Sequence, residues 1–388
     1  MLLCPARGLV GRGQGRVFSW PPQEELMTTR RRTVAAIVAA GLAATGLAAC
    51  GDDAGPDAGS SSGKTVTLVS HDSFAASKNV LKKFEQKTGY RLKVLKSGDA
   101  GQAVNQAVLT KGHPQGDVFF GVDNTLLSRA LEQGVFQPYE AKGLSAVPVG
   151  LQLDGKRHRV TPIDTGDICV NYDKRYFEGK KLDPPQTLDD LADPAYKNLL
   201  VTENTATSSP GLGFLLGTVA QYGEQDWKTY WKRLRDNGVK VVDSWEQAYN
   251  EEFSGSAGGR KAGGDRPLVV SYASSPPVEV LYADPRPKEA PTGVATGTCF
   301  RQTEFAGLLD GAPNPEGGKA LLDFLLSDTF QRDMPLQMFV DPVVKGTPLP
   351  DLFTRYGAKA DGARTVAPQK IAEHREDWIS AWTSLVVK

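Results

Sequence analysis

Hydrophobic and polar residues alternate along residues 64–70, a stretch rich in β-branched side chains, and this pattern predicts a strand. Residues 75–88 carry apolar side chains at helical spacing and end before Gly89, which predicts a helix. The alternation continues with strands over 90–95 and 117–121 and helices over 102–110 and 124–133. Strands that alternate with helices predict a parallel sheet covered on both faces.

The rest of the chain mixes the two patterns. A strand over 160–172 leaves this first region, and the glycine-rich stretch 255–265 is expected to be a loop. Further strands are predicted over 199–202, 268–272 and 293–300. Helices are predicted over 187–191, 211–222, 227–236, 244–253, 317–326, 329–334 and 366–385.

The N-terminal part has the pattern of an export signal. Residues 28–32 end in three arginines, residues 33–46 carry no charge, and small residues precede Cys50. This order predicts a signal peptide over 27–49. Its apolar stretch is too short to span a bilayer, which takes about 20 apolar residues. The small residues before Cys50 resemble the bacterial lipobox, in which the cysteine is acylated. The paired arginines resemble a twin-arginine signal, so the Sec and Tat export routes both stay open.

Two segments flank this signal. Residues 1–26 show no periodicity, and we interpret them as a non-native extension with the true start at Met27. Residues 50–63 consist mainly of Gly, Ser and Asp, which is typical of a flexible tether.

Composition and charge narrow the function. Lys and Arg together number 45, as do Asp and Glu, so the net charge is zero, which argues against nucleic acid as a partner. The sequence has no Gly-x-Ser-x-Gly elbow, phosphate loop or HExxH motif, and its four histidines are dispersed. We therefore expect neither enzyme activity nor a metal or cofactor. Cys169 and Cys299 could form a disulfide or remain two buried thiols.

Polar residues follow two of the predicted strands. His71, Asp72 and Ser73 follow the first strand, and Asp123 and Asn124 follow the strand over 117–121. Ligands of open α/β sheets bind outside the carboxyl ends of strands, so these residues are candidate ligand contacts. The alternative is that they only cap the helices that come next.

A second group of candidates lies farther along. Ser208 and Ser209 precede Pro210 and Gly211 at a predicted helix start, which could receive an anion or could be ordinary capping. The aromatic residues Trp245, Tyr272 and Phe339 lie at loop or strand ends and could stack on a flat ligand. Carboxylates at Asp72, Asp123 or Asp164 could hold a cationic ligand, and Ser275 lies in a hinge-like turn after Tyr272.

Taken in order, the stretches 71–74, 117–124, 207–213, 244–249 and 271–276 resemble the thiamine-binding members of the solute-binding proteins of bacterial ABC importers. The resemblance covers nearly all of residues 64–387. It implies an α/β fold, a type II two-lobed periplasmic-binding-protein clamp in which each lobe is a mixed sheet flanked by helices. It also implies a monomer that captures thiamine or thiamine phosphates between its lobes and delivers them to an ABC permease. The lipid on Cys50 would hold it on the outer face of the cytoplasmic membrane.

The resemblance also assigns parts and roles. Lobe 1 would comprise 64–165 and 274–345, lobe 2 would comprise 166–273, and the helical segment 346–388 would pack on the lobes. Trp245 and Tyr272 match aromatics that pack on the ligand rings, whereas Phe339 stands where relatives carry tryptophan and His71 where relatives often carry tyrosine. Asp164 falls in the crossing-strand motif. The phosphate-side turn would consist of Ser208, Ser209 and the Gly211 backbone.

Two alternatives remain open. The first is a solute-binding protein for another small cation, a polyamine or ferric iron, although iron binders use adjacent tyrosines and residues 170–172 contain only Tyr172. The second is a thiamine-degrading enzyme with the same clamp fold, whose nucleophile would have to be Cys169 or Cys299.

Overall fold

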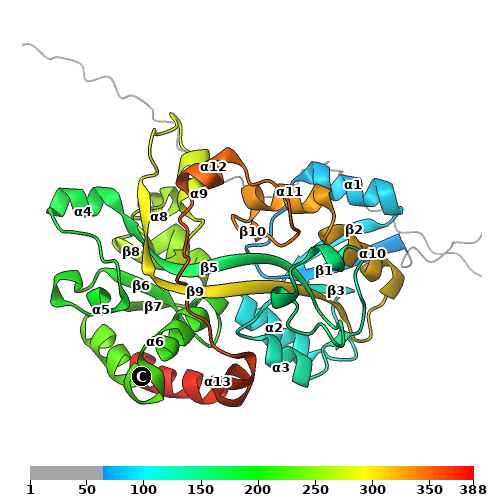
Figure 1. Cartoon of the computed structure of the whole chain (residues 1–388), viewed down its shortest axis with the longest axis horizontal. Coiled ribbons are helices and arrows are strands. Elements are labelled where there is room, and N and C mark those ends of the chain that lie inside the picture. Colours follow the sequence, from blue (N-terminus) through cyan, green and yellow to red (C-terminus); the bar gives the residue numbers. More distant parts are fainter. Residues whose placement is uncertain (1–63) are drawn as a thin grey trace, which may run out of the picture. The chain divides into compact units, whose positions relative to one another are not determined.

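The computed structural model describes residues 64–388 (Figure 1). The predicted signal peptide over 27–49, the lipid site at Cys50 and the tether over 50–63 lie outside the described residues. Within 64–388, no helix is long and apolar enough to cross a membrane.

The first region forms the parallel strands that the sequence predicts. Strand β1 (Thr65–Ser70) pairs in parallel with β2 (Arg91–Lys96) and with β3 (Val118–Asp123). Helices α1 (Lys78–Thr88), α2 (Ala100–Leu109) and α3 (Leu127–Glu132) alternate with these strands. The Ser77 side chain accepts the Val80 N–H at the start of α1, and Gly89 ends the helix in the left-handed conformation.

Two long strands make the sheet mixed. Strands β5 (Thr161–Asp173) and β9 (Thr292–Leu309) pair antiparallel with each other, and β9 also pairs antiparallel with β3. The strand order is β2-β1-β3-β9-β5-β8-β6-β7, so β5 and β9 extend from the first region into the second (Figure 1). The prediction for β9 ended at residue 300, because nearly all of its second half is buried and lacks the alternation that marks a strand.

The second region, at the other end of the sheet from β1, β2 and β3, is built on shorter strands. They are β6 (Leu200–Glu203), β7 (Lys240–Val242) and β8 (Leu268–Tyr272), while β4 (Phe136–Gln137) and β10 (Asp341–Pro342) add short pairings to β9 and β5. The helices from here on are α4 (Lys174–Lys180), α5 (Leu188–Leu191), α6 (Ser209–Asp236), α7 (Trp245–Gln247), α8 (Ala257–Ala262), α9 (Pro276–Leu281), α10 (Pro315–Leu325), α11 (Asp328–Gln337), α12 (Asp351–Tyr356) and α13 (Pro368–Trp382). Short turns are η2 (Leu144–Ala146), η3 (Val149–Leu151), η4 (Pro194–Tyr196), η5 (Ala248–Glu252) and η6 (Thr383–Val387).

One local prediction was wrong, and two others are refined. The expected loop over 255–265 contains α8, which Ser256 caps by accepting the Gly259 N–H. The turn predicted after Tyr272 is present but short, because α9 starts at Pro276 and Pro277. The two helices predicted over 211–222 and 227–236 are the two parts of α6, which are separated by a kink at Gly223, where φ and ψ are not helical.

The core packs against both faces of the sheet. Leu68 and Phe120 face one side with α1 and α10, whereas the neighbouring Val69 and Phe119 face the other side. Helix α13 contacts both regions: Arg375 donates to Ser128 Oγ beside α3, and the Trp378 indole donates to Glu224 of α6. The boundaries of the two lobes stay a prediction. The first half of β9, which was assigned to lobe 1, pairs with the second half of β5, which was assigned to lobe 2.

Cys169 and Cys299 form a disulfide that joins β5 to β9 across 130 residues of sequence. Both side chains are fully buried. Neither thiol is therefore free in this structure.

Candidate ligand-binding site

Three acidic residues lie side by side on neighbouring strands. In the sheet register, Glu304 of β9 pairs with Asp123 of β3 on one side and with Asp164 of β5 on the other. Side chains directly opposite on adjacent strands are about 5 Å apart, and like charges at that distance destabilise the sheet. This row of carboxyl groups, together with His71, Asp99 and Glu203, is called the acidic site below.

The carboxyl groups of this row differ in how they are satisfied. Asp123 is fully buried and accepts hydrogen bonds from Thr125, Leu126 and Gln302. Burial raises the pKa of Asp123 to about 6 against these hydrogen bonds. Asp164 is 1% exposed, and in the described chain neither of its oxygens accepts a hydrogen bond from an N–H group or an alcohol hydroxyl; its side-chain partner is the neighbouring Glu304 carboxyl. Burial and the neighbouring Glu304 raise the pKa of Asp164 well above its ordinary value.

His71 lies beside this row at the end of β1. Its Nε2 is 3.5 Å from Glu304 Oε1. Burial lowers the pKa of His71, but the Glu304 carboxylate and the charge of Asp99 together raise it above the usual value. The imidazole occupies space beside Gly121, where an added Cβ would lie 2.2 Å from His71 Cδ2. Gly121 also has φ +102°, so glycine is favoured at this bulge in β3.

The end of β6 and the start of α2 contribute the remaining carboxyl groups. Glu203, the last residue of β6, is fully buried, and apart from its own backbone N–H, its two oxygens have no hydrogen-bond partner in the described chain. Asp99 caps α2 and accepts the backbone N–H of Trp245 at 2.8 Å. Burial raises the pKa of both carboxyls, and the charge of Asp99 adds to the effect on Glu203.

A glutamine connects the start of α6 to the row of acids. Gln302 Nε2 donates to Asp123 Oδ2 at 2.7 Å and to Ser209 Oγ at 3.3 Å. Ser208 and Ser209 are buried next to Gly211, which packs against the Glu203 backbone. The predicted phosphate-side turn and the acidic row therefore belong to one continuous polar site.

Aromatic side chains form the other wall of this site. Trp245 stacks on Tyr249 with ring centroids 5.1 Å apart, and Tyr272 is 6.3 Å from Trp245. The Trp245 indole donates to Ser271 Oγ, which in turn lies 2.9 Å from Ser275 Oγ. The structure thus brings together Trp245, Tyr272 and Ser275, which the sequence analysis singled out.

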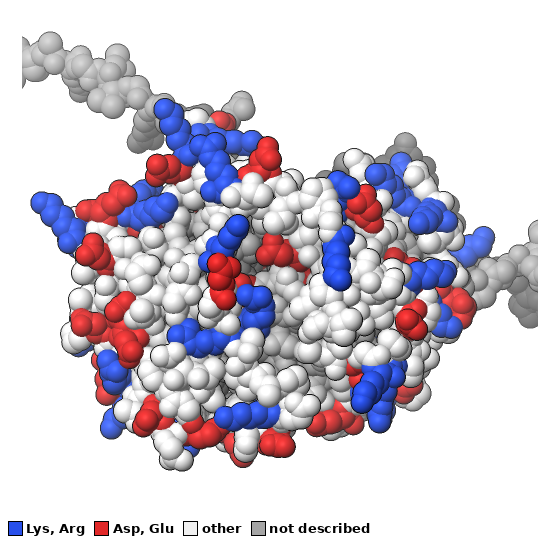
Figure 2. Space-filling view, in the orientation of Figure 1, with Lys and Arg blue, Asp and Glu red and all other residues white. Residues whose placement is uncertain are grey.

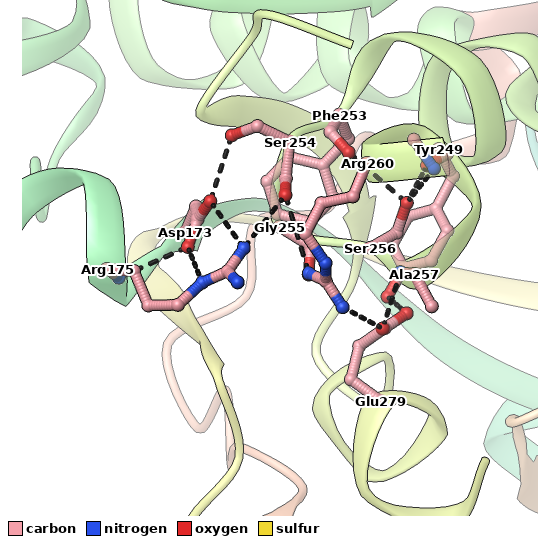
Figure 3. Close-up of polar contacts among 11 residues, drawn as sticks. Asp173, Arg175, Tyr249, Phe253, Ser254, Gly255, Ser256, Ala257, Arg260 and Glu279 are labelled. Atoms are coloured by element: carbon pink, nitrogen blue, oxygen red, sulfur yellow. Dashed lines mark hydrogen bonds and ion pairs between the residues drawn. The ribbon is translucent and has the colours of Figure 1, made fainter. Parts of the chain in front are cut away.

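A buried polar network supports the back of this wall (Figure 3). The Tyr249 hydroxyl donates to Glu279 Oε1, and Glu279 Oε2 accepts the Ala257 N–H. Arg260 approaches the same carboxylate at 3.9 Å. The hydrogen bond to Glu279 therefore holds Tyr249 in the position in which its ring stacks on Trp245.

Other predicted contacts have structural partners. Asp72 is exposed, and its carboxylate accepts the Gly98 N–H. Asn124 ties β3 to β9 through the Arg301 carbonyl and the Thr303 N–H. Ser73 donates to Glu246 Oε1 in the second region. The capping alternative therefore describes Asn124 poorly, and it describes Asp123 only in part.

Phe339 has surroundings of its own. Its ring stacks on Phe353 of α12 at 6.0 Å and lies 6.2 Å from Tyr282. Its carbonyl accepts the Ser274 hydroxyl. The Phe339 ring thus packs against α12 and the end of α9, and its stacking on a ligand stays a prediction.

Asp99, Glu203, Gln302 and Glu304 were not predicted from the sequence. Gln302 and Glu304 lie in the half of β9 that carries no alternating pattern. Glu203 follows the predicted strand 199–202 by one residue, which is the position after a strand end that singled out His71 and Asp123. Among residues 64–388, no group of three or more His, Cys, Asp or Glu side chains is arranged to hold a metal ion.

Comparison with known proteins adds sequence and fold relatives. Residues 114–261 match the family model of the bacterial extracellular solute-binding proteins. A thiamine-binding periplasmic protein of Escherichia coli is 29% identical over 83% of this chain and 93% of its own length. An iron uptake protein of Synechocystis is 23% identical over 75% of this chain and 79% of its own length.

A solved structure agrees with these relatives. A periplasmic thiamin binding protein matches with a TM-score of 0.71 and 27% identity, covering 84% of this chain and 96% of its own. The predicted α/β solute-binding clamp is thereby confirmed as the fold class. In sequence and in fold, the chain is therefore similar to the bacterial extracellular solute-binding proteins, the thiamine-binding periplasmic proteins among them.

Proposed function

We propose that this chain captures thiamine, free or as a phosphate ester, between its two lobes and delivers it to an ABC permease. The observation that carries the proposal is the row Asp123–Glu304–Asp164 beside the wall of Trp245 and Tyr272. Thiamine joins a flat aminopyrimidine to a cationic thiazolium, so aromatic faces suit its rings and carboxylates suit its charge and amino group.

Electrostatics supports a cationic ligand. Like charges on adjacent strands raise the energy of the ligand-free site, and neither Asp164 oxygen accepts a hydrogen bond from an N–H group or an alcohol hydroxyl in the described chain. A cation with hydrogen-bond donors would relieve both costs at once. The ligand-free site is then less stable than it could be, which is a common cost of a functional site.

Contacts between the two regions suit closure around a ligand. The Trp245 N–H meets Asp99, the Ser73 hydroxyl meets Glu246, and the Gln102 N–H donates to the Thr207 carbonyl. We infer that these hydrogen bonds belong to a closed clamp, since hinge closure around ligands is the usual motion of periplasmic binding proteins.

The proposal assigns binding roles to the residues named from the sequence: His71, Asp72, Ser73, Asp123, Asn124, Asp164, Ser208, Ser209, Gly211, Trp245, Tyr272, Ser275 and Phe339. It also keeps the lipid on Cys50 as the anchor that holds the clamp near its permease. Mass spectrometry of the membrane fraction would detect the acylated Cys50 peptide, and an unmodified peptide would remove the anchor from the proposal.

The test of the ligand is a calorimetric titration of the purified chain with thiamine. Binding at micromolar concentration or below is expected, and absence of binding there would sink the proposal. Spermidine and ferric citrate serve as competitors for the alternative ligands. We do not propose an enzyme, because both candidate nucleophiles, Cys169 and Cys299, are joined in a buried disulfide. Incubation with thiamine should leave the thiamine intact.

A further inference from the structure

The acidic site has an unbalanced charge. It contains the carboxyl groups of Asp99, Asp123, Asp164, Glu203 and Glu304. Within residues 64–388, none of these carboxyls pairs with a Lys or Arg side chain; their one ion-pair partner is His71, beside Glu304. Two neighbouring cations have other partners, since Lys96 donates to the Asp72 carbonyl and Arg301 pairs with Asp167.

The start of α6 is the feature of this site that would ordinarily attract an anion. Here two carboxyl groups already lie beside it. The Glu203 carbonyl is 2.4 Å from the position that a Gly211 Cβ would take, and the Glu203 Cβ is 3.0 Å from it. The charge of Asp99 acts on Glu203 and raises its pKa further. Asp99 also interacts with the Ser208 side chain. Pro210 also lacks an N–H, so the first turn has fewer donors for an anion.

We propose that Glu203, with Asp99, makes this site discriminate against phosphate esters, so that the chain takes thiamine as the unesterified cation. The inference rests on the proposed function and decides between the two ligand forms that the function leaves open. Whichever way the ligand lies, a phosphate group adds negative charge to a buried site whose carboxyls no Lys or Arg side chain balances. The uncharged hydroxyl of free thiamine adds none, and it can donate a hydrogen bond to a carboxyl oxygen of Glu203.

Discrimination of this kind arises from repulsion as much as from attraction. When Glu203 is ionised, a phosphate group, which has acceptor oxygens, offers no donor to its two carboxylate oxygens. Beside a hydroxyl or an ammonium-type cation they would gain a donor. The same side chain therefore favours one ligand and opposes the other.

The experiment measures the dissociation constants of thiamine, thiamine monophosphate and thiamine diphosphate by calorimetry at one ionic strength and pH 8. The wild-type chain is expected to bind thiamine at least about tenfold more tightly than either ester. Glu203→Gln keeps the side-chain volume and cannot ionise. The variant is expected to lower the ratio of the ester dissociation constants to that of thiamine by about fivefold or more, mainly through tighter binding of the esters.

Glu178→Gln is the matched control, because it removes the same charge from an exposed position on α4 of the second region. It should leave the ratio unchanged. If Glu203→Gln fails to fold by circular dichroism, Asp99→Asn takes its place, with the same direction expected.

Two results would overturn the inference. One is a wild-type chain that binds an ester as tightly as thiamine. The other is a folded Glu203→Gln variant whose ratio equals that of the wild type. Failure of the wild type to bind thiamine and both esters would instead contradict the proposed function, so the two failures are distinguishable.

Discussion

Two sets of buried carboxyl groups in this protein differ in the hydrogen-bond donors that the chain supplies to them. At the start of β3, both Asp117 oxygens accept backbone N–H groups, from Thr67 at 2.7 Å and from Asn314 at 2.6 Å. In the acidic site, Asp164 and Glu203 are equally buried, yet apart from the Glu304 carboxyl beside Asp164 and the backbone N–H of Glu203 itself, their four oxygens have no hydrogen-bond partner in the described chain. The first arrangement stabilises the fold, whereas the second destabilises it unless something else supplies the missing donors and positive charge.

The network in Figure 3 belongs with Asp117 rather than with the acidic site. Asp173 accepts hydrogen bonds from Arg175 and Ser254, and Glu279 accepts them from Tyr249 and Ala257. The face of the molecule in Figure 2 likewise intersperses acidic and basic side chains. A buried site rich in carboxyls and without a paired Lys or Arg therefore differs from the remainder of the described chain.

The largest effect on stability is expected from replacing Asp117, whose two oxygens both accept hydrogen bonds. Asp117→Ala leaves two buried N–H groups without their acceptor, and each such loss costs about 1–3 kcal/mol. We expect urea unfolding to give a free energy of unfolding lower by about 3 kcal/mol. Asp377→Ala, at an exposed position on α13, should change it by less than about 0.5 kcal/mol. A stability loss for Asp117→Ala no larger than that of the control would contradict the role given to Asp117.

The aromatic wall is expected to contribute slightly less, and to binding rather than to stability. Trp245→Ala should weaken thiamine binding by about 30- to 100-fold, which corresponds to about 2–3 kcal/mol. Trp245→Phe retains a ring and should lose less than about tenfold. Quenching of intrinsic fluorescence or calorimetry gives both values. Unchanged affinity in Trp245→Ala would remove this wall from the site.

The pH dependence of binding sharpens the comparison further. Burial raises the pKa of Asp123 to about 6, whereas an unfolded aspartate titrates near about 4. Stability from Asp123 in the ligand-free protein is therefore present below pH of about 4 and is lost as the pH rises through about 6. The charged groups facing Asp123 are Glu304 and Asp164, with Gln302 and Thr125 as donors.

A bound cation should lower the pKa of Asp123, so thiamine affinity should rise with pH. We expect binding about tenfold weaker at pH 5 than at pH 7. Asp123→Asn should flatten this profile. A wild-type affinity that stays constant or falls between pH 5 and pH 7 would count against a cationic ligand at this position.

The smallest effect is expected at the contact between the two regions. Ser73→Ala removes the hydrogen bond to Glu246, a net contribution of about 0.5–1 kcal/mol. Thiamine affinity should fall by about threefold with little change in urea unfolding of the ligand-free chain. An equal loss of stability without ligand would indicate that the contact supports the fold and not closure.

The sequence predicted the local parts of this molecule better than its long-range parts. Strands β1, β2 and β3 and their parallel pairing follow from periodicity and from Gly89. Trp245 and Tyr272 were found because motifs surround them. The acidic row could not be predicted, because it depends on the register of β3, β9 and β5, which brings Asp123 and Glu304 together across 181 residues of sequence. No local pattern encodes that register.

The central claim is that the unpartnered carboxyls of the acidic site exist for a cationic ligand, and Asp164→Asn tests it most directly. Thermal unfolding of wild type and variant is compared without ligand and with saturating thiamine. Without ligand, we expect the variant to be more stable by about 1 kcal/mol, because an amide avoids the cost of keeping a buried carboxyl, ionised or protonated, beside Glu304. With thiamine, the order should reverse, because the wild type binds more tightly and gains more stability. A variant that is less stable without ligand, or that gains as much from thiamine as the wild type does, would contradict the account.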